Sequence, residues 1–200
     1  MAKIPSYPSA PVPSVQVNYA VGRDMIKTGD IINFFESHEE TALHRITTKS
    51  VLYFTGSRIY HTGIAIWVNP DGQARPRLML IEAVGVGRRL VNLSHFRDNK
   101  MEVHTLPNTV DRKRVMDYML DGIGTKYGFF QLPAIAFTEF FGASYPKQKT
   151  GQVCSEAAAI AWELGGFQFD TTSLSPGRLR NYLGMKGVPP AFMINPHAGD

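Results

Sequence analysis

The chain has 200 residues, of which 44% are hydrophobic and 19% charged, so it is long enough to bury the core of one domain. Its single cysteine excludes an intrachain disulfide framework and any metal site built from several cysteines. The formal net charge is +4, but the basic residues are scattered without interleaved aromatic residues, so we expect no nucleic-acid partner. They include Arg88, Arg89, Arg178, Arg180 and the run at 112–114, and we expect most of them to be solvated surface.

The N-terminal segment is rich in proline, at positions 5, 8, 11 and 13, and lacks the apolar core of a signal peptide. We expect residues 1–20 to form an extended arm that docks on the domain or on a protein partner, and residues 21–200 to form a single domain. No apolar run reaches the roughly 18 to 20 residues that a transmembrane segment needs. The expected location is therefore the cytoplasm, or a site reached without a signal peptide through lysis or virion delivery. Residues 129–141 are expected to be a buried core segment, or an apolar wall for a lipid-like group or a partner.

Hydrophobic periodicity and turn signals predict the elements in chain order. Four strands are predicted, over residues 30–35, 61–68, 77–84 and 101–106. Three helices are predicted, over residues 111–121, 153–164 and 175–183, with glycines after the first two and a Ser-Pro start for the third. Residues 37–56 are expected to be helical or mixed. Helices beside a cluster of antiparallel strands predict an α+β domain.

Cys154 stands in the first turn of the helix predicted over 153–164. Free backbone N–H groups and the positive end of the helix dipole favour a thiolate at this position, and the same groups can bind an oxyanion. The alternative is a small buried hydrophobic residue, because free cysteines are usually buried. Position alone leaves both interpretations open.

His61 and Glu82 lie on the two strands that a turn signal at 69–72 joins. The strand around Glu82 is apolar on both faces, so this carboxylate is expected to be buried and to need a cationic or N–H partner. If Val68 faces Arg77 across the turn, His61 opposes Val84, and Glu82 is its diagonal neighbour on the same face. A slip of one residue would separate the pair, and a shift of two would place them directly opposite.

In that register Glu82 can hold the imidazole of His61 while the other ring nitrogen faces Cys154. This order of groups predicts a nucleophile, a base and an orienting carboxylate. The alternative for His61 is a structural histidine at a strand end.

Other motifs lack the spacing that their chemistry requires. His38 and His44 are six residues apart, whereas a zinc-protease helix needs histidines four apart. The glycines at 85 and 87 are not followed by a third glycine and a helix, so no dinucleotide site is expected. No serine stands in a Gly-x-Ser-x-Gly elbow. We therefore expect no metal and no cofactor.

Five segments in order resemble the permuted, NlpC-like branch of the papain-fold cysteine amidases and peptidases, close to the YiiX-like proteins. They are Thr-Gly-Asp-Ile-Ile at 28–32, the histidine strand at 55–64, Ile-Glu-Ala at 81–83 with glycines at 85 and 87, Gly-Thr-Lys-Tyr-Gly-Phe-Phe at 124–130, and Val-Cys-Ser-Glu at 153–156. The resemblance covers about residues 22–185. Gly128 stands where the family commonly has an aspartate, and the segment 131–152 is long and apolar. Both departures concern the identity of the substrate more than the three residues of the site.

The resemblance implies a permuted papain-like fold with Cys154 as nucleophile, His61 as base and Glu82 as orienting residue. It also implies that Tyr60, Tyr127 and Ser155 line or adjoin the substrate cleft, with core packing as the alternative for Tyr127. The implied activity is hydrolysis of amide bonds in cell-wall peptides or in amino-acid or lipid amides. Two alternatives are a non-catalytic module in a larger assembly such as a virion, and a membrane-associated acyltransferase.

Overall fold

A mixed sheet runs through the computed structural model, which describes residues 7–35, 57–69, 75–84, 87–124, 154–170 and 174–198. Within these residues the sheet has seven strands in the order β1-β7-β6-β2-β3-β4-β5. They are β1 (Gln16–Val17), β2 (Ile31–Phe35), β3 (Ile59–Val68), β4 (Arg77–Val84), β5 (Gly87–Asn92), β6 (Met101–His104) and β7 (Phe192–Ile194). Neighbouring strands are antiparallel except β1 and β7, which are parallel.

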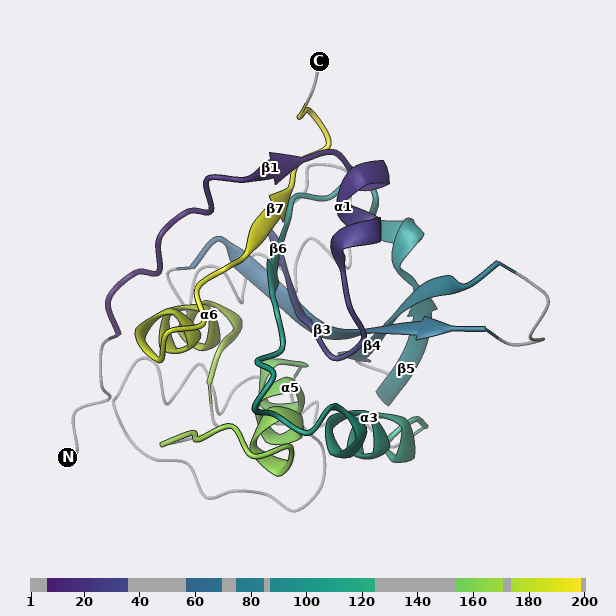
Figure 1. The fold of residues 1–200 in the computed structure, drawn as a ribbon, viewed down its shortest axis with the longest axis vertical. Helices are drawn as coiled ribbons and strands as arrows, with labels where there is room; N and C mark the ends of the chain where they lie inside the picture. Colours follow the sequence, from purple (N-terminus) through teal and green to yellow (C-terminus); the bar gives the residue numbers. More distant parts are fainter. Residues whose placement is uncertain are drawn as a thin grey trace.

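Helices cover both sides of this sheet. The helices of the described residues are α1 (Tyr19–Met25), the short 3-10 helix η1 (Leu93–Phe96), α3 (Arg112–Asp121), α5 (Cys154–Leu164) and α6 (Pro176–Met185). Figure 1 shows α3, α5 and α6 grouped below the sheet, with α1 above it. One hydrophobic cluster joins α3, α5 and α6 to the sheet around the fully buried Trp162 and Tyr182, and a second lies on the opposite face around Phe34 and Leu80. The chain is therefore an α+β domain, as predicted.

The predicted strands and helices are all present, as β2, β3, β4, β6, α3, α5 and α6. The side chain of Asp111 caps the start of helix α3 by accepting hydrogen bonds from the N–H groups of Lys113 and Arg114. An aspartate at a helix start is a local signal that can be read from the sequence. The elements that were not predicted are α1, η1, β1, β5 and β7, each of seven residues or fewer.

The hairpin of β3 and β4 has the predicted register. Val68 pairs with Arg77, and the pairing continues to Gly63 and Glu82. Glu82 is buried in a strand whose neighbours on both faces are also buried, as the sequence indicated.

The described part of the proline-rich arm docks on its own domain. Figure 1 shows the segment, in purple, passing beside α6 before it reaches β7 as β1. The N–H group of Ala10 donates to Asn181 Oδ1 at 3.1 Å, and Arg180 Nη1 donates to the Ala10 carbonyl at 2.8 Å. The ring of Tyr7 meets Tyr182 edge-on at 5.1 Å between centroids. The sequence left two docking partners open for the arm, its own domain and another protein, and residues 7–17 contact the domain.

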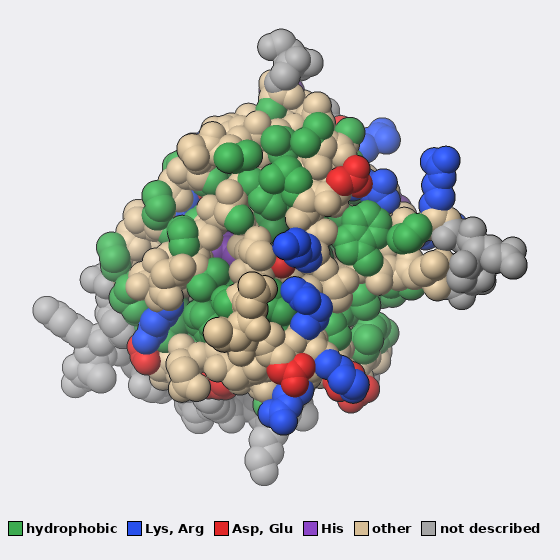
Figure 2. Space-filling view, in the orientation of Figure 1, with side chains coloured by type: hydrophobic (Ala, Val, Ile, Leu, Met, Phe, Trp, Pro, Cys, Tyr) green, Lys and Arg blue, Asp and Glu red, His purple; other side chains and the backbone are tan. Residues whose placement is uncertain are grey.

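Several expectations fall on other parts of the chain. The segment expected to be helical or mixed, 37–56, and the apolar segment 129–141 lie outside the described residues. In the ranges that are described, no helix has the length and apolar character needed to cross a membrane. Figure 2 shows one face of the molecule, on which Lys and Arg side chains are spread out with Asp and Glu side chains between several of them.

Candidate active site

His61 and Glu82 meet on one face of the β3–β4 hairpin. His61 Nε2 lies 2.6 Å from Glu82 Oε2, and the two side chains are 11% and 1% exposed. The ring of His61 also lies against Phe34, with centroids 5.6 Å apart, and against Tyr60 at 6.1 Å. Because a one-residue slip would place the two side chains on opposite faces, this contact depends on the register described above.

Cys154 is the first residue of α5 and is 9% exposed. The His61 side chain and the backbone N–H groups of Thr62 and Ser155 lie close enough to the sulfur to lower the pKa of the thiol. Since Glu82 engages Nε2 of His61, the ring nitrogen left for the sulfur is Nδ1. The structure therefore brings Cys154, His61 and Glu82 together in the order that the sequence predicted.

The charges of the three groups support one another. Burial raises the pKa of the Cys154 thiol, but the His61 charge and the N–H groups of Thr62 and Ser155 outweigh burial and lower it. Burial works against the protonated imidazole as well, yet Cys154 and Glu82 raise the pKa of His61 to about 10. Burial also opposes ionisation of Glu82, but His61 and Arg89 hold its pKa below the usual value. The lowered pKa of the thiol and the raised pKa of the imidazole both shift the group toward a thiolate beside an imidazolium.

Arg89 contacts this group, although the sequence analysis expected it to be solvated surface. It lies directly opposite Glu82 in the β4–β5 pairing. Its Nε and Nη2 donate to Glu82 Oε1 at 2.8 Å and 2.7 Å, while half of its side chain stays exposed. The requirement that Glu82 find a cationic partner is thus met by two residues, His61 and Arg89.

Arg88 is an exception to the expectation that most basic residues are solvated. Consecutive residues of a strand point to opposite faces, so Arg88 turns away from Glu82 and is buried. Its Nη1 donates to the Tyr118 carbonyl at 2.7 Å, and its guanidinium lies 4.6 Å from the Tyr118 ring centroid. Arg88 therefore binds the last turns of α3 rather than solvent.

The three residues expected near the cleft have different surroundings. Tyr60 is buried beside His61, and its hydroxyl accepts a hydrogen bond from Asn99 Nδ2 at 3.3 Å. The Ser155 hydroxyl is fully buried and donates to the Leu174 carbonyl at 2.5 Å, so only its backbone N–H faces the sulfur. Tyr127 lies outside the described residues.

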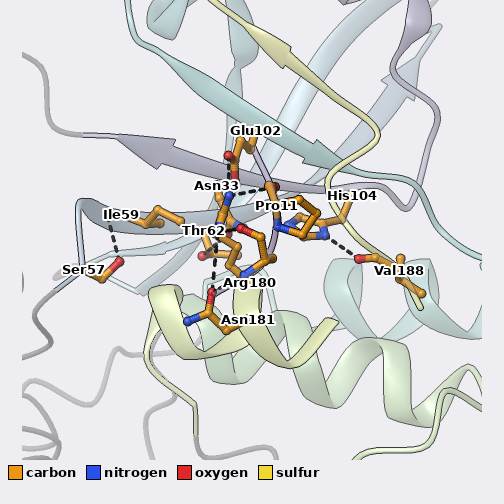
Figure 3. A network of polar contacts seen from close by, with 11 residues as sticks. Pro11, Asn33, Ser57, Ile59, Thr62, Glu102, His104, Arg180, Asn181 and Val188 are labelled. Atoms are coloured by element: carbon orange, nitrogen blue, oxygen red, sulfur yellow. Dashed lines mark hydrogen bonds and ion pairs between the residues drawn. The ribbon is translucent and has the colours of Figure 1, made fainter. Parts of the chain in front are cut away.

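A buried polar row lies behind the site, and sequence reasoning missed it. Thr62, Asn33 and Glu102 stand side by side on β3, β2 and β6, and Figure 3 shows Arg180 reaching this row from α6. Thr62 Oγ1 donates to Asn33 Oδ1 at 2.8 Å, and Arg180 Nη2 donates to Glu102 Oε1 at 2.9 Å. The side chain of Arg180 is only 11% exposed, which corrects its expected place on the surface.

A signal for this row exists in the sequence. Asn33 and Glu102 interrupt apolar strands just as Glu82 does, and both are fully buried. A polar residue inside an apolar strand needs a buried partner, so the argument applied to Glu82 extends to them.

Within the described ranges, no group of three or more His, Cys, Asp or Glu side chains is arranged to hold a metal ion. The geometry that carries chemistry is the Cys154, His61 and Glu82 group, which is suited to nucleophilic attack on a carbonyl. Comparison with known proteins finds no family model that matches the chain and no curated protein that matches it significantly.

Proposed function

We propose that the protein is a cysteine-dependent hydrolase of amide bonds with a permuted papain-like fold. The observation that carries the proposal is the contact chain from the Cys154 sulfur through His61 to Glu82, with a 2.6 Å separation between His61 Nε2 and Glu82 Oε2. A buried histidine in a purely structural role needs no thiol partner. Here the imidazole joins the lone cysteine of the chain to a buried carboxylate, which is the arrangement that activates a thiol.

The reaction begins with attack of the Cys154 thiolate on the carbonyl carbon of an amide, which forms a C–S bond and a tetrahedral oxyanion. The backbone N–H groups of Thr62 on β3 and of Ser155 at the start of α5 favour negative charge at the reacting sulfur. The His61 imidazolium then donates a proton to the leaving amine as the C–N bond breaks. Water, deprotonated by His61, hydrolyses the resulting thioester and releases the acid.

The substrate class rests on the resemblance described for the sequence, which favours cell-wall peptide amides or amino-acid and lipid amides. The alternative of a non-catalytic assembly module drew on the proline-rich arm and on the apolar segment 129–141, which lies outside the described residues. In its described part that arm contacts its own domain through Ala10 and Tyr7, so this feature no longer favours a partner over the domain.

The test uses the fact that every thiol adduct reports on one residue, because Cys154 is the only cysteine. The rate of alkylation by iodoacetamide is measured from pH 5 to pH 10 for the wild type and for His61→Ala. An ordinary cysteine thiol titrates with a midpoint of about 8.5. We expect the alkylation rate of the wild type to rise at a pH well below this midpoint, and His61→Ala to move the rise toward it. A wild-type midpoint near about 8.5 that His61→Ala leaves unchanged refutes the proposal.

The substrate is then sought by mass spectrometry of the intact protein after incubation with cell-wall fragments or lipid extracts. We expect an acyl adduct on wild-type Cys154 and none on Cys154→Ser. Adducts of equal mass on both proteins would show labelling of another residue and count against the mechanism.

A further inference from the structure

Both oxygens of Glu82 have a partner, and the two partners differ in kind. Oε2 faces His61, the group that the mechanism uses, while Oε1 accepts two hydrogen bonds from Arg89, at 2.8 Å and 2.7 Å. The Glu82 side chain is 1% exposed, so water does not replace a lost partner there without rearrangement.

The fold holds Arg89 in this place. Strands β4 and β5 are joined by a short connection, and Val84 pairs with Gly87 next to it. Gly87 has a φ of 124°, a conformation that residues with a Cβ rarely adopt. The register of β4 and β5 places Arg89 directly opposite Glu82.

The charged groups that face His61 come from two directions. Cys154 approaches from α5 and Glu82 from β4, while Phe34 on β2 and Tyr60 on the same strand contribute uncharged rings. Arg89 contacts this group through Glu82. It can therefore act on the thiol by fixing the orientation of Glu82 and, through it, of His61.

Removal of the guanidinium would leave Glu82 Oε1 buried without its cationic partner. Burial opposes the ionised carboxylate, so Glu82 without Arg89 becomes a weaker partner for the His61 imidazolium. An imidazolium with weaker support stabilises the Cys154 thiolate less, so the thiol becomes less reactive at neutral pH. The chemistry depends on the charge of a residue that does not touch the sulfur.

We infer that Arg89 is a positioning residue of the proposed hydrolase, which holds Oε1 of Glu82 so that Oε2 orients His61 toward Cys154. The inference rests on the proposed function and extends it from three residues to four. Arg89 takes no part in bond making or bond breaking.

The experiment compares Arg89→Ala, Arg89→Gln and Arg89→Lys by the pH profile of Cys154 alkylation with iodoacetamide. Arg97→Ala is the matched control, because it removes the same charge from a side chain that is 68% exposed. Among the described residues, Arg97 forms an ion pair with Asp98, which is also exposed. We expect Arg89→Ala and Arg89→Gln to raise the midpoint by about one pH unit, which lowers the rate about tenfold below the wild-type midpoint. Arg89→Lys should recover part of the rate, and Arg97→Ala should match the wild type.

Chemical rescue separates positioning from a general loss of structure. Guanidinium ion at low, non-denaturing concentration should increase the alkylation rate of Arg89→Ala at neutral pH and leave Arg97→Ala unchanged, whereas the same concentration of sodium should have no effect. Circular dichroism checks that each variant is folded, and Arg89→Lys retains a cation should the smaller side chains prevent folding.

The outcomes distinguish this inference from the proposed function. If Arg89→Ala and Arg89→Lys both titrate like the wild type while His61→Ala shifts the midpoint, Arg89 has no positioning role and the hydrolase proposal stands. If the wild type itself titrates as an ordinary thiol, both fail.

Discussion

The pair of Arg180 and Glu102 gives the sharpest test of how the polar row supports the domain. Glu102 is fully buried and Arg180 is 11% exposed, with Nε 2.5 Å from Oε2 and Nη2 2.9 Å from Oε1. Arg180→Ala leaves the carboxylate buried without this partner and also removes the hydrogen bonds to the carbonyls of Ala10 and Pro11. Breaking a buried pair in this way costs about 3 to 5 kcal/mol, a large share of the roughly 5 to 15 kcal/mol that stabilises a typical domain.

The assay is urea denaturation followed by circular dichroism at pH 7, with thermal melting beside it. For a chain of this size, about 4 kcal/mol corresponds to a fall in Tm of about 10 °C. Lys113→Ala is the control, since its pair with Asp117 is also short, at 2.7 Å, but its side chain is 83% exposed. The control should lose no more than about 0.5 kcal/mol.

A double variant, Glu102→Gln with Arg180→Met, removes both charges and should recover part of the stability lost in Arg180→Ala. If Arg180→Ala lost less than about 1 kcal/mol, as an exposed pair does, the reasoning from burial would be refuted.

Three further predictions follow from single contacts. Burial, with Arg180 nearby, lowers the pKa of His104 to about 4, whereas an unfolded histidine binds a proton near 6.5. The unfolded state therefore binds more protons between these two pH values, and the free energy of unfolding should fall by about 3 kcal/mol as the pH drops from 6.5 to 4. Urea titrations of His104→Asn should show a smaller fall over the same pH range. An equal fall would contradict this assignment. A Cβ on Gly63 would lie 2.6 Å from Leu80 Cδ1 and 3.0 Å from the Ile81 carbonyl oxygen, so Gly63→Ala should lose about 1 to 3 kcal/mol, and an unchanged Tm would argue against the tight packing. Asn181→Ala removes the acceptor of the Ala10 N–H, so limited proteolysis should cleave the arm sooner than in the wild type, while an identical cleavage rate would mean that this bond does not hold the arm.

The contact between His61 and Glu82 could be predicted because it depends on local rules. A turn signal between two strands sets the register, and the two-residue period of a strand decides which side chains share a face. The helix start at Cys154 is equally local. These rules act within about 25 residues, so one sequence suffices to apply them.

The role of Arg89 could not be predicted from the same rules. Its charge suggested solvent, and β5 begins Gly-Arg-Arg, which is too polar to be identified as the start of a strand. The partner of Arg180 lies 78 residues away, at Glu102 on a strand that the sequence does predict. Here the missing information was which elements lie side by side, which depends on packing of the whole domain rather than on local pattern.

The pairing of β1 with β7 has a consequence for self-association. An open strand edge offers unpaired N–H and C=O groups to another chain, and natural proteins shorten or interrupt such edges. Here the outermost strand has only two residues, Gln16 and Val17, and it covers β7. The segment before it contains Pro8, Pro11 and Pro13, which have no N–H to donate. The arm thus closes one side of the sheet against the addition of strands from other molecules, so a protein that lacks the arm should be more prone to aggregate through this edge.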